Sequence, residues 1–348
     1  MAAPEPVRSP LVRKLLVVGG VLVAANLVLA VVGPALSEPV TFPTREIQLA
    51  IDRLDERASS GCVDLLVTGN SVAAEALSAQ RLAEGVGLDN GVVSVLPGSI
   101  GTVDVDWMNR VTLPRADPGT VVYVASPLMF VPEDIASEYG LGIYTRAIAI
   151  RDGWAGDLHR WAIDHVPLMK YRLALADTEG LVDQAEGDVP ETYDEVIEAA
   201  GWTLEADGHI ASTGSWSGSS SFLDRLEEEA DRLEGRWRID QVQVDALADQ
   251  FRRLGDERRR VIMVIPPVTD DLIQTYPGGP AGFEEYLAAA RSLGEGPGPV
   301  VIDLSSAAYP DELFRDTHHL NEAGSRRLTE EVTAALQDTE AVACAEVP

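Results

Sequence analysis

The sequence has little positive charge. Its 348 residues include 27 lysines and arginines against 56 aspartates and glutamates, which gives a formal net charge of −29. Lysine occurs only at Lys14 and Lys170. Nucleic acids and anionic membrane surfaces attract basic side chains, so we do not expect either as the main partner. The acidity is typical of a well-solvated protein surface.

Patterns that hold phosphates, cofactors or metals are also scarce. The phosphate-binding pattern Gly-x4-Gly-Lys-Ser/Thr does not occur, and the paired glycines Gly19 and Gly20 lie inside an apolar run. Histidine and carboxylate side chains at metal-ligand spacing are confined to residues 316–319. We therefore expect no cofactor and no metal, with a metal at residues 316–319 as the less favoured alternative.

Only two cysteines are present, Cys62 and Cys344. Cys62 precedes the first predicted strand and Cys344 follows the last predicted helix, so both can lie on the same rim of one domain. A disulfide outside the cytoplasm and two separate buried thiols are both compatible with this placement.

The N-terminal residues form a separate piece. Arg8, Arg13 and Lys14 precede an uncharged apolar run at residues 15–32. As a helix this run is about 27 Å long, close to the roughly 30 Å hydrocarbon core of a bilayer. The basic flank predicts a cytoplasmic tail at residues 1–14 and a single transmembrane signal anchor at residues 15–34, with the rest of the chain outside the cytoplasm. A cleaved signal peptide is the alternative. A buried core helix is disfavoured because the run has no polar face.

Short β-branched runs alternate with helical segments after residue 60. The predicted strands are residues 63–68, 91–96, 120–125, 260–265 and 300–304. The predicted helices are residues 73–83, 103–113, 242–254, 283–293 and 322–336. This alternation is typical of a parallel sheet covered on both faces by helices. The predicted fold class is therefore α/β, with a parallel sheet of about five strands in a domain at residues 61–340.

Two segments lie outside this alternation. Residues 35–60 are predicted to form a stalk or a first helix. At about residues 131–238 the pattern breaks, which indicates a large insertion that is either a lid or a decoration. The insertion contains five tryptophans, a Gly/Ser-rich piece at residues 212–221 and a predicted acidic helix at residues 223–233. The tryptophans could stack on sugar rings or pack the core of a subdomain.

A serine follows the first predicted strand through a sharp turn. Gly69 permits a close backbone approach, so Ser71 can stand above the carboxyl edge of the sheet at the start of a helix. There its hydroxyl could attack an acyl carbonyl. The alternative is that Ser71 only caps the helix, which serine often does.

An acid and a histidine precede the last predicted helix. His319 could take the proton from Ser71, and Asp316, three residues earlier, could hold the imidazole tautomer. His318 is an alternative base. A further alternative is that Asp316 or Asn321 caps the last helix and the histidines face solvent.

Together these pieces resemble the SGNH (GDSL-like) hydrolase superfamily over about half of the chain. Residues 69–71 (Gly-Asn-Ser) look like the first sequence block of that superfamily, with Asn in place of the usual Asp. Residues 97–99 (Pro-Gly-Ser) look like the second block, and residues 316–319 have the Asp-x-x-His spacing of the fifth, which favours His319 over His318. The resemblance implies a three-layer, flavodoxin-like domain and an oxyanion hole formed by the backbone amides of Ser71 and Gly98.

The third block of the superfamily, Gly-x-Asn-Asp, is missing, and the chain reads Ala-Ser-Pro-Leu-Met at residues 125–129. The usual asparagine oxyanion donor is therefore absent, and Asn70 or Ser126 would have to take its place.

The anchor, the insertion and the altered third block look like the membrane-anchored DltD-like and envelope-polymer O-acyltransferase-type branch. That likeness implies a single-pass protein of the cell membrane, with an extracytoplasmic serine esterase or O-acyltransferase acting on acyl groups of cell-envelope glycans or on an acylated small molecule. A membrane acyl-transfer protein is the implied partner. The rival hypothesis is a non-catalytic SGNH-like scaffold or glycan-binding partner of an acyl-transfer system.

Overall fold

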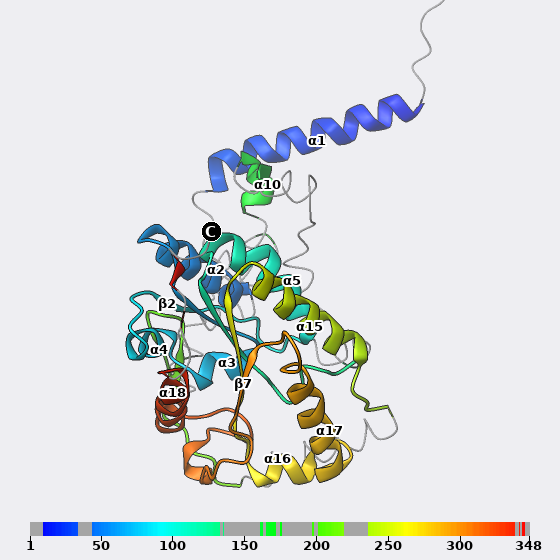
Figure 1. The fold of residues 1–348 in the computed structure, drawn as a ribbon. Coiled ribbons are helices and arrows are strands. Elements are labelled where there is room, and N and C mark those ends of the chain that lie inside the picture. Colours follow the sequence, from blue (N-terminus) through cyan, green and yellow to red (C-terminus); the bar gives the residue numbers. More distant parts are fainter. Residues whose placement is uncertain are drawn as a thin grey trace, which may run out of the picture. The chain divides into compact units, whose positions relative to one another are not determined.

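A five-stranded parallel sheet forms the centre of the larger part of the protein (Figure 1). The computed structural model describes residues 10–33, 44–132, 201–218 and 236–337, together with residues 135, 161–162, 165–171, 175, 197, 341, 343 and 344. The strands are β1 (Leu65–Thr68), β2 (Gly91–Val93), β3 (Thr120–Val124), β6 (Arg260–Ile265) and β7 (Val300–Asp303). Their order is β2-β1-β3-β6-β7, and every pairing is parallel. The prediction of an α/β chain with five parallel strands is confirmed.

Helices lie on both sides of this sheet (Figure 1). On one side are α3 (Ser71–Ala76), α4 (Ala79–Gly85) and α18 (Glu322–Gln337). On the other side are α5 (Gly101–Trp107), α15 (Gln241–Asp256) and α17 (Gly279–Ser292). The shorter elements are α6 (Leu113–Ala116), α16 (Asp270–Thr275), a π-helical turn (Met108–Thr112) and a 3-10 turn (Asp311–Leu313).

Successive strand residues face opposite sides of the sheet, as the two-residue period of a strand requires. Leu65, Val67, Val122 and Val124 pack in one buried core with residues of α3, α4 and α18. Tyr123 faces the other way, and its ring meets Phe251 of α15 at 5.3 Å in an edge-on contact. β1, β2, β3 and all of β6 except Arg260 are buried on both faces, which explains why they are continuous apolar runs, whereas the edge strand β7 is only partly buried.

The helix predicted at residues 73–83 is two helices. Leu77 has an extended backbone (φ −135°, ψ 126°) and ends α3. The Ser78 side chain then accepts a hydrogen bond from the Arg81 amide and caps α4. Serine competes for backbone amides in this way, so it starts a new helix where the apolar spacing alone predicted one continuous helix.

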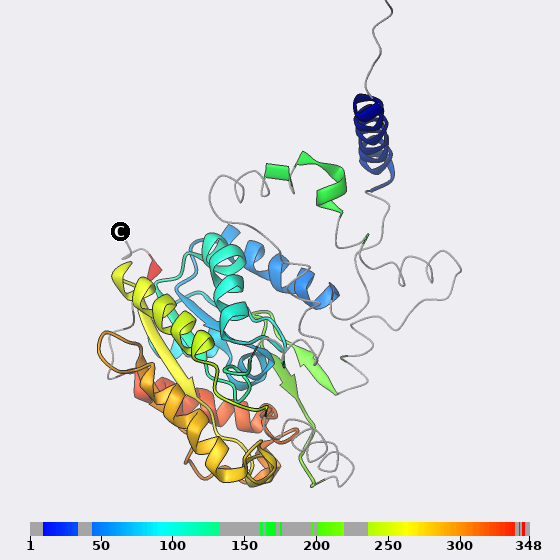
Figure 2. The same ribbon diagram turned by 90° about the vertical axis from the view of Figure 1, so that its right-hand side faces the viewer.

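A β-hairpin within the predicted insertion was not foreseen from the sequence. β4 (Trp202–Leu204) and β5 (Ile210–Ser212) pair antiparallel (Figure 2). The Asp207 carbonyl in its turn accepts from the Val93 amide at 2.7 Å, and the Asp207 carboxylate accepts from Ser78 Oγ at 2.9 Å. The turn is therefore fixed to β2 and α4. The predicted helix at residues 223–233 lies outside the described residues.

The N-terminal helix α1 (Pro10–Val32) has Arg13 and Lys14 near its start and no charged residue after them. Its segment Lys14–Val32 is long and apolar enough to cross a membrane, and a signal sequence would have the same composition. The Asn26 side chain is satisfied locally, because Nδ2 donates to the Leu22 carbonyl at 2.9 Å and Oδ1 accepts from the Leu168 amide of α10 (Pro167–Lys170) at 3.0 Å. By contacts, residues 1–45 group with residues 150–193, and residues 46–149 group with residues 194–348. The last helix before the sheet, α2 (Thr44–Ser59), buries Ile47 and Leu54.

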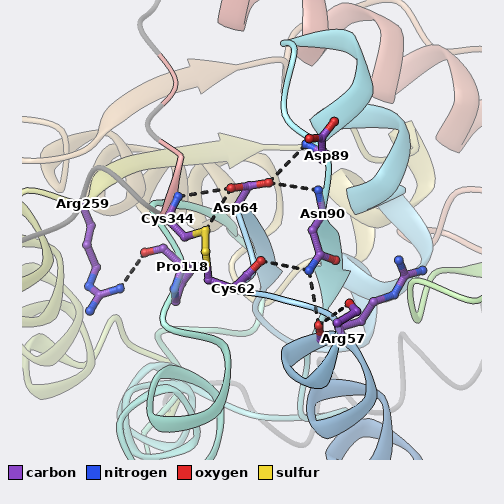
Figure 3. The surroundings of a disulfide bond; sticks show 9 residues. Arg57, Cys62, Asp64, Asp89, Asn90, Pro118, Arg259 and Cys344 are labelled. Atoms are coloured by element: carbon purple, nitrogen blue, oxygen red, sulfur yellow. Dashed lines mark hydrogen bonds between the residues drawn. A yellow bond between two sulfur atoms is a disulfide. The ribbon is translucent and has the colours of Figure 1, made fainter.

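A disulfide joins Cys62 to Cys344 at the amino end of β1 (Figure 3). Their Cα atoms are 5.9 Å apart, and 282 positions separate them in the sequence. Asp64 organises the surroundings, since its carboxylate accepts from the backbone amides of Cys344 at 3.2 Å and Asn90 at 3.1 Å. Of the two arrangements compatible with the sequence, the structure has the paired one.

A buried carboxyl group connects α5 to β3 and to the loop after β2. Asp104 accepts a hydrogen bond from the Tyr123 hydroxyl at 2.5 Å and is also hydrogen-bonded to Ser99 Oγ. Burial raises the pKa of Asp104 to about 7, although the hydrogen bonds with Ser99 and Tyr123 act in the opposite direction. Asp104 is therefore largely protonated below neutral pH.

We expect replacement of both cysteines, Cys62→Ser with Cys344→Ser, to lower the free energy of unfolding by about 2–5 kcal/mol, because the open chain gains entropy when a long loop is released. Urea unfolding of the purified protein, followed by tryptophan fluorescence, measures this loss. A reductant should cause the same loss in the wild-type protein and none in the double variant. Wild-type protein that is equally stable with and without reductant would contradict the prediction.

We expect Asp104→Asn to remove a pH dependence of stability. The folded carboxyl has a pKa of about 7. The unfolded one titrates near 3.9, so the contribution of Asp104 to stability is greatest below pH 4 and falls as pH rises toward 7. Each unit of separation between the two pKa values is worth about 1.4 kcal/mol. Relative to wild type, Asp104→Asn should gain stability between pH 5 and pH 8 in thermal unfolding, whereas Asp106→Asn, on the same helix but exposed, should not.

Candidate functional site

The candidate site lies where the strand order reverses. β1 pairs with β2 on one side and β3 on the other, and ligand sites of parallel sheets form at the carboxyl ends of such strands. The chain leaves β1 at Thr68 and turns at Gly69, whose φ is 137°. A Cβ at Gly69 would lie 2.8 Å from the Val124 carbonyl oxygen of β3, so only glycine allows this turn.

Asn70, not Ser71, caps α3. The Asn70 side chain accepts from the Val72 amide at 3.1 Å, and its backbone is extended. The interpretation of Ser71 as a helix cap is therefore wrong, and the Ser71 hydroxyl remains available for another partner.

That partner is His319. Ser71 Oγ and His319 Nε2 are 3.0 Å apart, although 248 positions separate the two residues. On the other side of the ring, His319 Nδ1 is 2.8 Å from Asp316 Oδ2 and 3.1 Å from Oδ1. An ionised carboxylate only accepts, so Nδ1 carries the proton, and Nε2 accepts from the serine hydroxyl. The structure thus brings together Ser71, His319 and Asp316 in one continuous hydrogen-bonded chain.

The loop that carries the acid and the histidine is fixed by its own backbone. Asp316 Oδ1 accepts from the amides of His318 and His319 at 3.0 and 2.9 Å. The Arg315 amide donates to the His319 carbonyl at 2.8 Å. The Asn321 side chain accepts from the Gly324 amide at 3.1 Å at the start of α18. Asn321 is therefore the residue that caps α18, and Asp316 is free to orient the imidazole.

The electrostatics favour an ionised acid and a basic histidine. Burial opposes ionisation of Asp316, but His319, His318 and Arg315 outweigh it and hold the pKa of Asp316 well below its usual range. Burial also opposes protonation of His319, but the charges of Glu75 and Asp316 and the hydrogen bond to Asp316 raise the pKa of His319 above its ordinary value. His319 is thus a stronger base than a free imidazole.

His318 has a different environment. Its ring packs against the His319 ring with centroids 4.2 Å apart, and its Nδ1 lies 3.2 Å from Thr317 Oγ1. Burial and the neighbouring His319 charge lower the pKa of His318 to about 4. The ligand atoms of Asp316, His318 and His319 lie within 4.8 Å of one another, close enough for a cation. The carboxylate and His319 are instead hydrogen-bonded to each other, so we assign no metal to this group.

The loop after β2 lies beside the Ser71 turn. The Ser99 amide donates to the Leu96 carbonyl at 3.2 Å across Pro97 and Gly98, and Gly98 has φ 65°, which together define a type II turn. The amide that closes this turn belongs to Ser99, so the Gly98 amide takes no part in it. The Leu96 amide donates to the Gly69 carbonyl at 3.2 Å and holds the two loops together.

The two residues considered as substitute oxyanion donors have other contacts. Asn70 Nδ2 donates to the Ser99 carbonyl at 3.4 Å, so this side chain joins the Ser71 turn to the Gly98 loop. Ser126 Oγ, after β3, accepts from the Leu128 amide at 3.2 Å. The proposed oxyanion role of Asn70, Ser71 and Gly98 stays a prediction.

Two residues of the site, Glu75 and Arg315, were not predicted from the sequence. Glu75 lies one turn after Ser71 on α3, is 3% exposed, and places Oε1 3.9 Å from His319 Nε2. Arg315 holds both Glu75 oxygens, at 2.7 and 2.8 Å. A signal existed for Glu75, because it is the one charged residue in the otherwise small and apolar helix at residues 71–76.

No protein-family model matches the chain, and no curated protein is significantly similar to it in sequence. The site must therefore be interpreted from its own geometry.

Proposed function

We propose that the protein is a membrane-anchored serine esterase or O-acyltransferase that acts on acyl groups of cell-envelope glycans. The observation that carries the proposal is the chain of hydrogen bonds from Ser71 through His319 to Asp316, at 3.0 and 2.8 Å. This is the arrangement that activates a serine hydroxyl for attack on an acyl carbonyl.

In the first step, Ser71 Oγ forms a bond to the acyl carbonyl carbon while its proton moves to His319 Nε2. Asp316 keeps the Nδ1 proton in place and stabilises the imidazolium. The oxyanion that forms on the carbonyl oxygen is stabilised by the backbone amides of Ser71 and Gly98. Collapse of the intermediate transfers the Nε2 proton to the leaving alcohol and leaves an acyl group on Ser71.

In the second step, water or a sugar hydroxyl attacks the acyl-enzyme. His319 takes the proton of the attacking group and returns it to Ser71 Oγ as the acyl group departs. Water as the acceptor gives an esterase, and a sugar hydroxyl gives an O-acyltransferase. The same three residues serve both reactions.

Several features support the location and the family likeness. The strand order β2-β1-β3-β6-β7 is the 2-1-3-4-5 order of flavodoxin-like sheets, which agrees with the SGNH resemblance. A disulfide favours a compartment outside the reducing cytoplasm, and α1 is apolar enough for a single-pass anchor. The glycan substrate and a membrane acyl-transfer partner follow from the resemblance alone.

We expect Ser71→Ala to abolish covalent labelling by a fluorophosphonate and to lower hydrolysis of an aryl acetate by at least about 10³-fold, because no nucleophile remains. The purified full chain in detergent is the material for both assays. Ser305→Ala is the matched control, since Ser305 follows β7 at the same edge of the sheet and its hydroxyl is hydrogen-bonded to Asp303 and Arg291, not to a residue of the Ser71–His319–Asp316 chain. Labelling that persists in Ser71→Ala would contradict the assignment of the nucleophile.

We expect His319→Ala to lower turnover by about 10²–10⁴-fold through loss of the general base. His318→Ala should change it by less than about tenfold, because His318 does not contact Ser71. The non-catalytic scaffold would be favoured by two results together. The wild-type protein would neither hydrolyse esters nor be labelled, and Ser71→Ala would support normal function in cells.

A further inference from the structure

A second acidic group faces the same histidine. Glu75 Oε1 lies 3.9 Å from His319 Nε2, the nitrogen that also faces Ser71 Oγ at 3.0 Å. Asp316 lies on the opposite nitrogen, Nδ1. His319 is therefore flanked by carboxylates on both ring nitrogens, and only the one on Nδ1 belongs to the serine–histidine–aspartate chain.

Arg315 connects the two carboxylates. Its Nε and Nη2 donate to the two oxygens of Glu75, and Nη2 also lies 3.3 Å from Asp316 Oδ2. The guanidinium carbon is 4.8 Å from the centre of the Trp202 ring in the β4–β5 hairpin. A planar guanidinium that is held by two carboxylates and an aromatic ring has little freedom to move.

We propose that Glu75 and Arg315 are positioning residues of the site, which set the strength of His319 as a base and reserve its Nε2 for Ser71. The inference rests on the proposed function for its catalytic meaning. The effect of Glu75 and Arg315 on the titration of His319 can be tested whether or not the protein cleaves esters.

The charges around His319 favour its protonated form. The groups that face His319 are Asp316, Arg315 and His318 from its own loop and Glu75 from α3. With His318 neutral, two carboxylates and one guanidinium give the cluster a net charge of −1 around a neutral His319. When His319 accepts the Ser71 proton, the cluster becomes neutral. Buried charge is least costly when it is balanced, so the cluster favours the imidazolium that forms during attack.

The hydrogen bonds of Glu75 leave His319 Nε2 to Ser71. A lone carboxylate beside Nε2 would favour the tautomer that carries the ring proton on Nε2 and would accept a hydrogen bond from it, so Nε2 could no longer accept from Ser71. Both Glu75 oxygens are occupied by Arg315, so Glu75 acts on His319 through its charge at 3.9 Å, and the hydroxyl keeps the hydrogen bond at 3.0 Å. Arg315 thus prevents Glu75 from displacing the nucleophile.

An ion pair that only holds α3 against the loop is the competing explanation. It would affect folding but not the titration of His319. The positioning role and the purely structural role are distinguished by the pH at which His319 titrates and by the direction in which substitutions of Glu75 and Arg315 shift this pH.

The first measurement is the pH profile of kcat/KM for an aryl acetate, using the full chain in detergent. The acid limb reports protonation of the base. Glu75→Gln removes a negative charge near Nε2, so the limb should move to lower pH by about 1–3 units, with a lower plateau because the imidazolium is less stabilised. Arg315→Gln leaves the net charge at −2, so the limb should move to higher pH. The exposed pair Arg252–Asp249 on α15 supplies the control, and Asp249→Asn should leave the profile unchanged.

The second measurement is an NMR titration of the full chain labelled with ¹³C at histidine Cε1. The sequence has five histidines, and the His319 signal is identified by its loss in His319→Gln. Glu75→Gln should lower the pH at the midpoint of the His319 titration, Arg315→Gln should raise it, and Asp249→Asn should not change it. If Glu75→Gln fails to fold, the paired variant Glu75→Gln with Arg315→Gln removes both members of the ion pair and leaves no unpaired buried charge. The paired variant should lower the titration midpoint of His319 by less than Glu75→Gln alone, because Glu75 raises the pKa of His319 more than Arg315 lowers it.

A His319 midpoint that stays at its wild-type value in Glu75→Gln, or in the paired variant, overturns the inference and leaves a purely structural ion pair. Midpoints that move as expected in a protein that shows no turnover and no Ser71 labelling uphold the electrostatic role and reject the proposed function.

Discussion

The parallel pairing of β1 with β2 and β3 is the constraint on which the site depends. It brings the carboxyl ends of these strands to one edge of the sheet, so the turn at Gly69, the turn at Gly98 and the end of β3 are neighbours. The close contact of Gly69 with the Val124 carbonyl fixes the direction in which the chain leaves β1. Ser71 is consequently placed by the sheet, and the loop before α18 needs only to bring a histidine to it.

The sequence was sufficient for the features that depend on local pattern. Strands that are buried on both faces are continuous apolar runs, so β1, β2, β3 and β6 could be recognised. β7 is only partly buried, but its Val-Val-Ile run is also apolar and β-branched. The Asp-x-x-His spacing selected His319 over His318, and the structure gives the physical reason, because Asp316 contacts His319 Nδ1 at 2.8 Å but lies 3.6 Å from His318 Nδ1.

Features that depend on contacts between distant segments could not be predicted. The pairing of Glu75 with Arg315 joins residues 240 positions apart, and neither position is unusual by itself beyond a charge in an apolar helix. The β4–β5 hairpin has strands of three residues and acquires its position from the contacts of Asp207 with β2 and α4. Periodicity carries no information about such contacts.

The disulfide closes almost the whole sheet-bearing part of the chain into a covalent ring, from Cys62 to Cys344. A protease that cuts the backbone once anywhere within this ring releases no fragment, because both new ends remain joined through the sulfur atoms. Loss of a piece therefore requires two cuts, or one cut together with reduction. A single cut between β3 and α15 thus leaves Ser71 and His319 in one covalently connected molecule.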